Sequence, residues 1–363
     1  MDPSKNITKS PSSERVNFLD GIRGLAALMV LLEHVVIDFL ASVQPIQYNS
    51  QFLSFITDGH FAVAIFFVLS GYVLTVSQTN RPQSLVALFI GRYCRLAIPI
   101  LITSAITYIL MIAGLFFIAG NTYQFTPTIL GLLKFSTVDV FVNYDIEKSY
   151  SPALWTMSAE LFGSYLLYLY IRFIARFERY QLILALAISM GLLIFQPFIA
   201  CFFMGYLIMQ LNTRYLFKEV KWTAVTCISA FVSVVVIVSL SPSLENWQRS
   251  LLAFVIVIAI SYATILRKVF SNAFLLFIGK ISFTLYLIQF TIICTLSAYL
   301  ATQFRDHDYV NAFSANLNLV ITVAICIAVA YVLNPIDTYS ILITKKIRSI
   351  NFRKLLSNDP SHH

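Results

Sequence analysis

An arginine and a histidine lie eleven positions apart in one apolar stretch, FLDGIRGLAALMVLLEHVV, which runs from position 18 to 36. On an α-helix this spacing places Arg23 and His34 on the same face, about 16 Å apart along the axis. Histidine suits proton transfer near neutral pH, and arginine suits a phosphate or carboxylate. Ionisable groups inside a membrane are costly and indicate function. The structural alternative is an arginine that reaches the interface and a histidine hydrogen-bonded between helices.

Three carboxylates accompany this pair. Asp38 lies one helical turn beyond His34, so it can share the face of the histidine and fix its tautomer. Asp20 precedes the apolar run and could do the same only if the chain folds back. Glu33 points about 100° away from His34 and is expected to pair with another helix.

A further carboxylate, Glu160, lies in the apolar segment SPALWTMSAELFGSYLLY, where Trp155 and Ser158 flank it. Such a group needs a buried cation as its partner. Two arginines in GRYCRLAIP, Arg92 and Arg95, lie three positions apart and therefore share one helix face. They could form a phosphate clamp, although anchoring at a cytoplasmic boundary is the simpler interpretation.

Two more apolar segments carry polar groups. In FFVLSGY the small pair Ser70 and Gly71 indicates close helix packing, and His60 is expected at the outer end of that helix. The segment FIGKISFTLYLIQF, at 277–290, carries Lys280, Ser282, Tyr286 and Gln289. Lys280 and Gln289 are nine positions apart, so an α-helix places them on opposite sides and their spacing does not join them in one site.

The composition predicts a polytopic membrane protein. Of its 363 residues 58% are hydrophobic and 12% are charged, whereas soluble domains carry about 25% charged residues. Runs of about 20 apolar residues can span a bilayer. They predict an all-α bundle of about ten spans, at 22–43, 59–78, 95–118, 151–171, 181–195, 197–210, 222–240, 250–266, 273–300 and 314–340. The short pair around Gln196 and Pro197 is either two tight helices or one broken span.

The basic residues predict the topology. With the N-terminus in the cytoplasm, 19 of the 25 lysines and arginines fall in cytoplasmic segments and 4 in the opposite loops. This bias predicts that both termini are cytoplasmic. It also accounts for the net charge of +8 without nucleic acid. We expect a cytoplasmic tail at 1–17, a membrane domain at 18–345 and a basic cytoplasmic tail at 346–363, whose final residues resemble a tag remnant.

Other kinds of site find no support. The five cysteines are scattered without a CxxC pair, so neither a disulfide framework nor a zinc site is expected. The chain contains no P-loop, GxSxG, HExxH or dinucleotide-binding motif. We therefore expect no metal and no bound cofactor.

Five motifs, taken in order, resemble those of the acyltransferase-3 family of integral-membrane O-acyltransferases. They are FLDGIRGLAALMVLLEHV, FAVAIFFVLSGYVL, GRYCRLAIP, LWTMSAELFGSYLLY and IGKISFTLYLIQF. Each motif alone is moderately specific, but all five in order are highly specific, and the resemblance covers about 16 to 345. Two positions depart from the family. Gln289 stands where a histidine is common, and Asn334 stands where a glutamate is common, which puts the acceptor and the acyl group in doubt.

The resemblance implies transfer of an acyl group, acetyl by default, from cytoplasmic acyl-CoA to a hydroxyl of an extracytoplasmic glycan or related acceptor. It implies that His34 is the base or acyl relay and that Glu160 supports the site. Arg23, Arg92 and Arg95 would bind the donor. Direct attack, aided by Asp38 or Asp20, and an acyl-histidine intermediate both stay open. Candidate site-lining residues are His60, Ser70, Trp155, Ser158, Tyr286 and Gln289.

The main alternative is a proton-coupled transporter of an anionic or acylated solute, with His34 and Glu160 as a proton relay. Inverted repeats would indicate it, but only one helix break, at Pro197, is visible. A structural membrane protein without chemistry would not need five polar motifs. Either way the chain is multi-pass and contacts lipid, in the plasma (inner) membrane of a bacterium or an internal membrane of a eukaryote. A homo-oligomer, the acceptor and the acyl chain length are left open.

Overall fold

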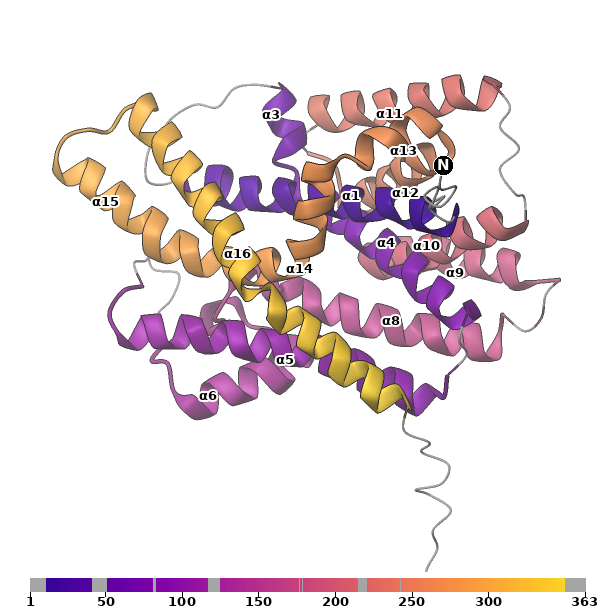
Figure 1. Cartoon of the computed structure of the whole chain (residues 1–363), viewed down its shortest axis with the longest axis horizontal. Helices are drawn as coiled ribbons and strands as arrows, with labels where there is room; N and C mark the ends of the chain where they lie inside the picture. Colours follow the sequence, from indigo (N-terminus) through magenta and orange to yellow (C-terminus); the bar gives the residue numbers. More distant parts are fainter. Residues whose placement is uncertain are drawn as a thin grey trace, which may run out of the picture.

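The computed structural model describes residues 11–40, 51–80, 83–116, 125–175, 177, 179–214, 221–241 and 243–349. Within these ranges the chain is helical and contains no strand (Figure 1). The elements of the first half are α1 Pro11–Leu32, η1 Glu33–Leu40, α3 Gln51–Ile56, α4 Gly59–Asn80, α5 Leu85–Ile112, α6 Ile129–Lys134, η2 Phe135–Asp139, α7 Val140–Val142, η3 Ile146–Lys148, η4 Pro152–Trp155 and α8 Thr156–Phe173. Those of the second half are α9 Gln181–Phe195, α10 Pro197–Arg214, α11 Lys221–Leu240, α12 Asn246–Tyr262, α13 Thr264–Phe270, α14 Ala273–Ile292, η5 Ile293–Ser297, α15 Ala298–Asp306 and α16 Ala312–Ser349.

Among the described residues, four helical segments are long and apolar enough to cross a membrane. They are Gly59–Thr79, Leu85–Ile112, Ala273–Asp306 and Ala312–Ile347. The pair α12 and α13, bent by 102° at the break between them, would be a fifth. The all-helical membrane architecture is therefore supported, whereas ten spans and cytoplasmic termini stay predictions.

The other predicted spans are helical but shorter or more charged. α1 carries Asp20 and Arg23, and α8 carries Glu160 and Arg172, and each charge lowers the mean hydropathy of its helix. The three apolar helices 181–195, 197–211 and 224–240 are shorter than the four long segments. Arg23 and Glu160, two residues from which the sequence predicted chemistry, thus lie on two of these helices.

The break at Gln196 separates two tight helices. Ser189 of α9 donates a hydrogen bond to the Ala200 carbonyl oxygen at 3.4 Å, and Tyr206 of α10 donates to Gln181 at 2.6 Å. Because the residue numbers fall along one helix as they rise along the other, α9 and α10 form an antiparallel hairpin. This geometry rules out a single broken span at this point.

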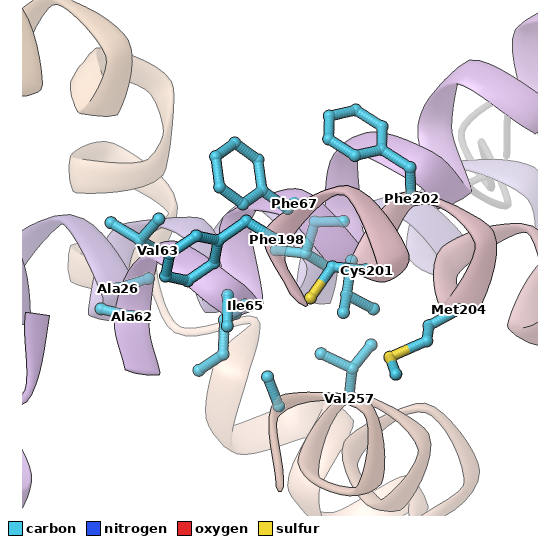
Figure 2. Packing of buried hydrophobic residues seen from close by; sticks show 14 of the residues in the cluster. Ala26, Ala62, Val63, Ile65, Phe67, Phe198, Cys201, Phe202, Met204 and Val257 are labelled. Atoms are coloured by element: carbon cyan, nitrogen blue, oxygen red, sulfur yellow. The ribbon is translucent and has the colours of Figure 1, made fainter. Parts of the chain in front are cut away.

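The largest apolar core of the described residues extends over several helices, and Figure 2 shows the part of it where α1, α4, α10 and α12 meet. Small residues let the backbones of α4 and α10 approach closely. A Cβ on Gly71 would overlap the Phe202 carbonyl group, and one on Gly205 would overlap the Val68 carbonyl oxygen. Gly71 thus serves the close packing that the Ser70–Gly71 pair predicts.

Glycines also set the crossing of α1 and α14. A Cβ on Gly24 would overlap the Leu275 carbonyl oxygen, and one on Gly279 would overlap the carbonyl oxygen of Asp20. The two backbones are therefore in direct contact, and this contact brings Asp20 and Arg23 of α1 to the same cavity as Lys280 of α14.

α16 completes the arrangement by crossing both α14 and α5, as Figure 1 shows. Thr344 of α16 donates a hydrogen bond of 3.0 Å to the carbonyl oxygen of Gly91 on α5. This bond fixes one end of α16 against the helix that carries the paired arginines.

Short polar residues fix where the central helices begin. Asp58 caps α4 by accepting from the Phe61 amide at 2.8 Å, and Ser84 caps α5. Asn272 caps α14 by accepting from the Leu275 amide at 3.0 Å. Each side chain satisfies an amide that the first helical turn leaves without a backbone partner. A buried ion pair of 2.9 Å between Asp58 and Arg249 also ties α4 to α12.

We predict that Gly24→Ala destabilises the protein, because the added methyl group must push α1 away from α14. Overpacking of this kind costs about 1–3 kcal/mol. Gly191 provides a matched control, since a Cβ at this helical position of α9 meets nothing within 4 Å. Gly191→Ala should instead raise stability by about 0.5–1 kcal/mol. Thermal unfolding of both variants in lipid nanodiscs tests this. A melting temperature that is equal for the two variants would contradict the proposed backbone contact.

Candidate functional site

A cavity of about 340 Å³ lies between α1, α4, α5, α8, α14 and α16. Seven charged side chains line it: Asp20, Arg23, Arg92, Arg95, Glu160, Lys280 and Asp337. Its apolar lining consists of Val63, Phe66, Phe67, Leu96, Met157, Phe283 and Ile341, and its uncharged polar lining of Ser70, Thr156, Ser282 and Tyr286. A charged region next to an apolar one suits a ligand with an anionic part and an apolar part.

Arg92 and Glu160 form the ion pair that joins α5 to α8. Arg92 is only 6% exposed, so its charge needs a carboxylate nearby. Ser70 of α4 donates to the same Glu160 oxygen at 3.0 Å, and the Arg92 Nε donates to Ser164 at 3.3 Å. The carboxylate thus has the buried cationic partner that the sequence required, and three helices meet at this point.

Arg95 and Lys280 line the same cavity, and no ion pair involving either is found within the described ranges. Arg95 is attracted by Asp337 and Glu160 and repelled by the other two arginines of the cavity. In total, four cations face three carboxylates. The cavity therefore carries a formal charge of +1 and favours an anion.

Asp20 and Arg23 form the exposed edge of the cavity. Their side chains are 43% and 28% exposed and lie 3.4 Å apart. α1 runs without a break from Asp20 to Leu32, and His34 follows fourteen positions after Asp20, which corresponds to about 21 Å along a helix. Because the chain does not fold back, Asp20 belongs to the arginine end of the cavity, and we do not propose it as the partner of His34.

Tyr286 closes the cavity on the side of α8. Its hydroxyl donates to the Ala153 carbonyl oxygen and lies 2.6 Å from the Thr156 hydroxyl. Both Tyr286 and Thr156 are buried. These bonds hold α14 against the start of α8, four residues before Glu160.

His34 is not among the residues that line the cavity. It is half-buried, and the Phe290 ring of α14 packs edge-on against it at 5.1 Å between ring centres. The π-helical turn η1 begins at Glu33, and such turns are frequent at functional sites. The Glu33 carboxylate packs over Gly59, where a Cβ would overlap it. Asp38 lies in η1, but its side chain is outside the part of the chain that the structure describes.

The remaining predicted residues lie around the cavity rather than in it. His60 is exposed at the start of α4. The centre of its ring lies 5.6 Å from that of Trp155 and 6.4 Å from that of Phe198. Ser158 lies half-buried on α8. Gln289 is fully buried on α14.

Sequence reasoning missed two charged cavity residues. Lys280 lies in the fifth motif, but its spacing from the candidate residue Gln289 did not join the two in one site, so Lys280 was not predicted. Asp337 lies in the last predicted span, 314–340, where the cost of an intramembrane carboxylate would have marked it. A search of every apolar span for charges, whatever their spacing, finds both.

We predict that Glu160→Gln destabilises the protein by about 3 kcal/mol, because it leaves the buried Arg92 charge without a counter-charge. Adding Arg92→Met to this variant should recover most of the loss. The exposed pair of Arg305 and Asp306, 3.8 Å apart, is the control, and Asp306→Asn should change stability by less than about 0.5 kcal/mol. Unfolding of the wild type and these three variants in lipid tests both expectations. Equal effects of Glu160→Gln and Asp306→Asn would show that the buried pair contributes no more than a surface pair.

Comparison with known proteins identifies the family to which this chain belongs. The family described as an acyltransferase domain matches residues 16–334, most of the chain. The match includes every cavity residue except the two on α16. No curated protein matches, and neither does any solved structure. The chain therefore belongs to acyltransferase family 3, a family of membrane acyltransferases.

Proposed function

We propose that this protein transfers an acyl group, acetyl by default, from cytoplasmic acyl-CoA to a hydroxyl of an extracytoplasmic glycan or related acceptor. The observation that carries the proposal is the cavity in which four cations face three carboxylates, next to an apolar lining. Acyl-CoA combines phosphates with a long uncharged arm that ends in the thioester, and its two parts suit the two regions of the cavity.

Arg95, Lys280 and Arg23 are the cations proposed to bind the phosphates. Arginine binds phosphate in a bidentate manner, and lysine adds a compact charge. Arg92 differs from them because Glu160 and Ser164 already occupy its guanidinium group. We propose that Arg92 adds to the positive field and that Glu160 holds it in place.

We propose that His34, eleven residues beyond Arg23, acts on the acceptor. It removes the proton of the acceptor hydroxyl as the oxygen attacks the thioester carbonyl carbon. The tetrahedral intermediate then releases coenzyme A as the thiolate, which takes up this proton from His34 and becomes the thiol, and the acyl ester remains on the acceptor. In the alternative order, His34 first accepts the acyl group and then passes it to the hydroxyl.

For His34 to have this role, the thioester must reach beyond the cavity that the structure describes. Tyr286 lines the cavity and Phe290 contacts His34, and these two positions are about 6 Å apart along α14. The donor arm must therefore pass Tyr286 to bring its carbonyl group to His34. Trp155 and the exposed His60, whose rings contact each other, are candidate groups for a sugar acceptor.

We predict that His34→Ala lowers kcat for acetyl transfer by a factor of about 10²–10⁴, because it removes the proposed base or relay. The full chain in lipid nanodiscs is supplied with acetyl-CoA and crude cell-envelope glycan, and free CoA thiol and labelled acetyl transfer are followed. His307→Ala is the control, since this histidine is exposed at the end of α15. Equal turnover in wild type and His34→Ala would exclude His34. Solute flux in liposomes without any turnover would favour a transporter.

We also predict that Arg95→Gln and Lys280→Gln each raise KM for acetyl-CoA about tenfold or more, because each removes a charge proposed to bind phosphate. S-acetylpantetheine, which lacks the nucleotide and its phosphates, separates this effect from general damage. Wild type should strongly prefer acetyl-CoA, and both variants should lose part of that preference. Arg305→Gln, on an exposed arginine, should behave as wild type. An unchanged preference in both cavity variants would contradict the phosphate site.

A further inference from the structure

The side chain of Gln289 is an unusual feature of α14. It is 0% exposed, and neither its amide nitrogen nor its amide oxygen has a hydrogen-bond partner in the part of the chain that the structure describes. A primary amide offers two N–H donors and an oxygen acceptor. Burying these groups without partners costs stability. Such a side chain therefore points to a group that binds it when the protein works.

Neighbouring polar residues of the same helix do have partners. Ser282 donates to the Gly279 carbonyl oxygen at 2.9 Å, and Thr291 is hydrogen-bonded to Thr107 of α5 at 2.7 Å. The hydroxyl of Tyr286 is bonded as described above. Among the described residues of α14, Gln289 is thus the one buried side chain that is left with unpaired polar atoms.

The position of Gln289 connects the cavity to His34. Ser282, Tyr286 and Gln289 are spaced four and three residues apart, so they share one face of α14. The first two line the cavity, and Gln289 is the next polar residue along that face. Phe290, the following residue, packs against His34. Gln289 therefore lies directly beside the residue of α14 that contacts His34.

We propose that Gln289 binds the acceptor and that the acceptor carries two neighbouring hydroxyl groups, as a sugar ring does. One hydroxyl donates to Oε1 while the other accepts from Nε2, so both unpaired atoms are satisfied. A thioester carbonyl group can only accept, and it would leave Oε1 bare. The donor therefore fits this amide less well than a diol does. This inference rests on the proposed acyl transfer.

Matched substrates and variants test the proposal. The full chain in lipid nanodiscs receives acetyl-CoA with either cyclohexane-1,2-diol or cyclohexanol, which differ by one hydroxyl group. Gln289→Met keeps the length of the side chain and removes both polar atoms, whereas Gln289→His keeps one donor and one acceptor when neutral. Gln303→Met on α15 is the control. The readouts are kcat and KM for each alcohol, KM for acetyl-CoA, and the melting temperature with and without the diol.

We expect wild type to prefer the diol at least tenfold in kcat/KM, since a site built to bind a hydroxyl rejects an analogue that lacks it. Gln289→Met should reduce this preference to about twofold or less, leave KM for acetyl-CoA unchanged, and melt no lower than wild type without the diol. Gln289→His should keep most of the preference. Gln303→Met should match wild type throughout.

Two results would overturn the proposal. One is a Gln289→Met variant that keeps the preference for the diol, because the amide would then be structural. The other is a wild type that does not distinguish the two alcohols although it transfers acetyl to the cell-envelope glycan. If wild type transfers acetyl to nothing, the proposed function fails separately. Gln289 is then judged by binding alone: a diol-induced rise in melting temperature in wild type but not in Gln289→Met supports it, and no difference rejects it.

Discussion

The ion pair between Arg92 and Glu160 is the interaction on which the cavity depends. A guanidinium group can be buried only with a counter-charge and hydrogen-bond partners, and Arg92 of α5 finds both on α8, in Glu160 and Ser164. Ser70 of α4 in turn donates a hydrogen bond to Glu160. One pair thus fixes the relative positions of three of the six cavity-lining helices. It also distinguishes the two arginines of the GRYCRLAIP motif. Arg92 is committed to Glu160, whereas Arg95, three residues on and on the same face, is the arginine that we propose to bind the donor.

The second constraint is the absence of side chains where α1 meets α14. Gly24 and Gly279 allow each backbone to touch the other, and this contact brings Arg23 of one helix and Lys280 of the other to a single cavity. Bulky residues at the crossing would separate the two cations. Packing and electrostatics are therefore coupled, because the positive field of the site exists only at a helix separation that glycine permits.

Much of the site could be predicted from sequence because intramembrane charges are few and each needs a reason. This argument found Arg92, Arg95 and Glu160. It failed where a regular α-helix was assumed or where only pairs were considered. Lys280 was set aside because it could not share a face with Gln289, although other helices bring partners to it. The position of His34 outside the cavity lining could not be predicted, since hydropathy does not reveal the π-helical turn that begins one residue before it.

The unbroken course of α1 has a consequence for the size of the donor. The helix is unbroken from Arg23 to Leu32, so the distance from the end proposed to bind phosphate to His34 is set by the rise of the helix, about 16 Å over eleven residues. The length of this helical segment therefore sets the distance that the donor must span. A donor whose anionic group and reactive carbon lie closer together than this cannot engage both ends at once, however well it binds to either. By this geometry, the length of the carrier arm becomes a criterion for selection, independent of the acyl group that the arm carries.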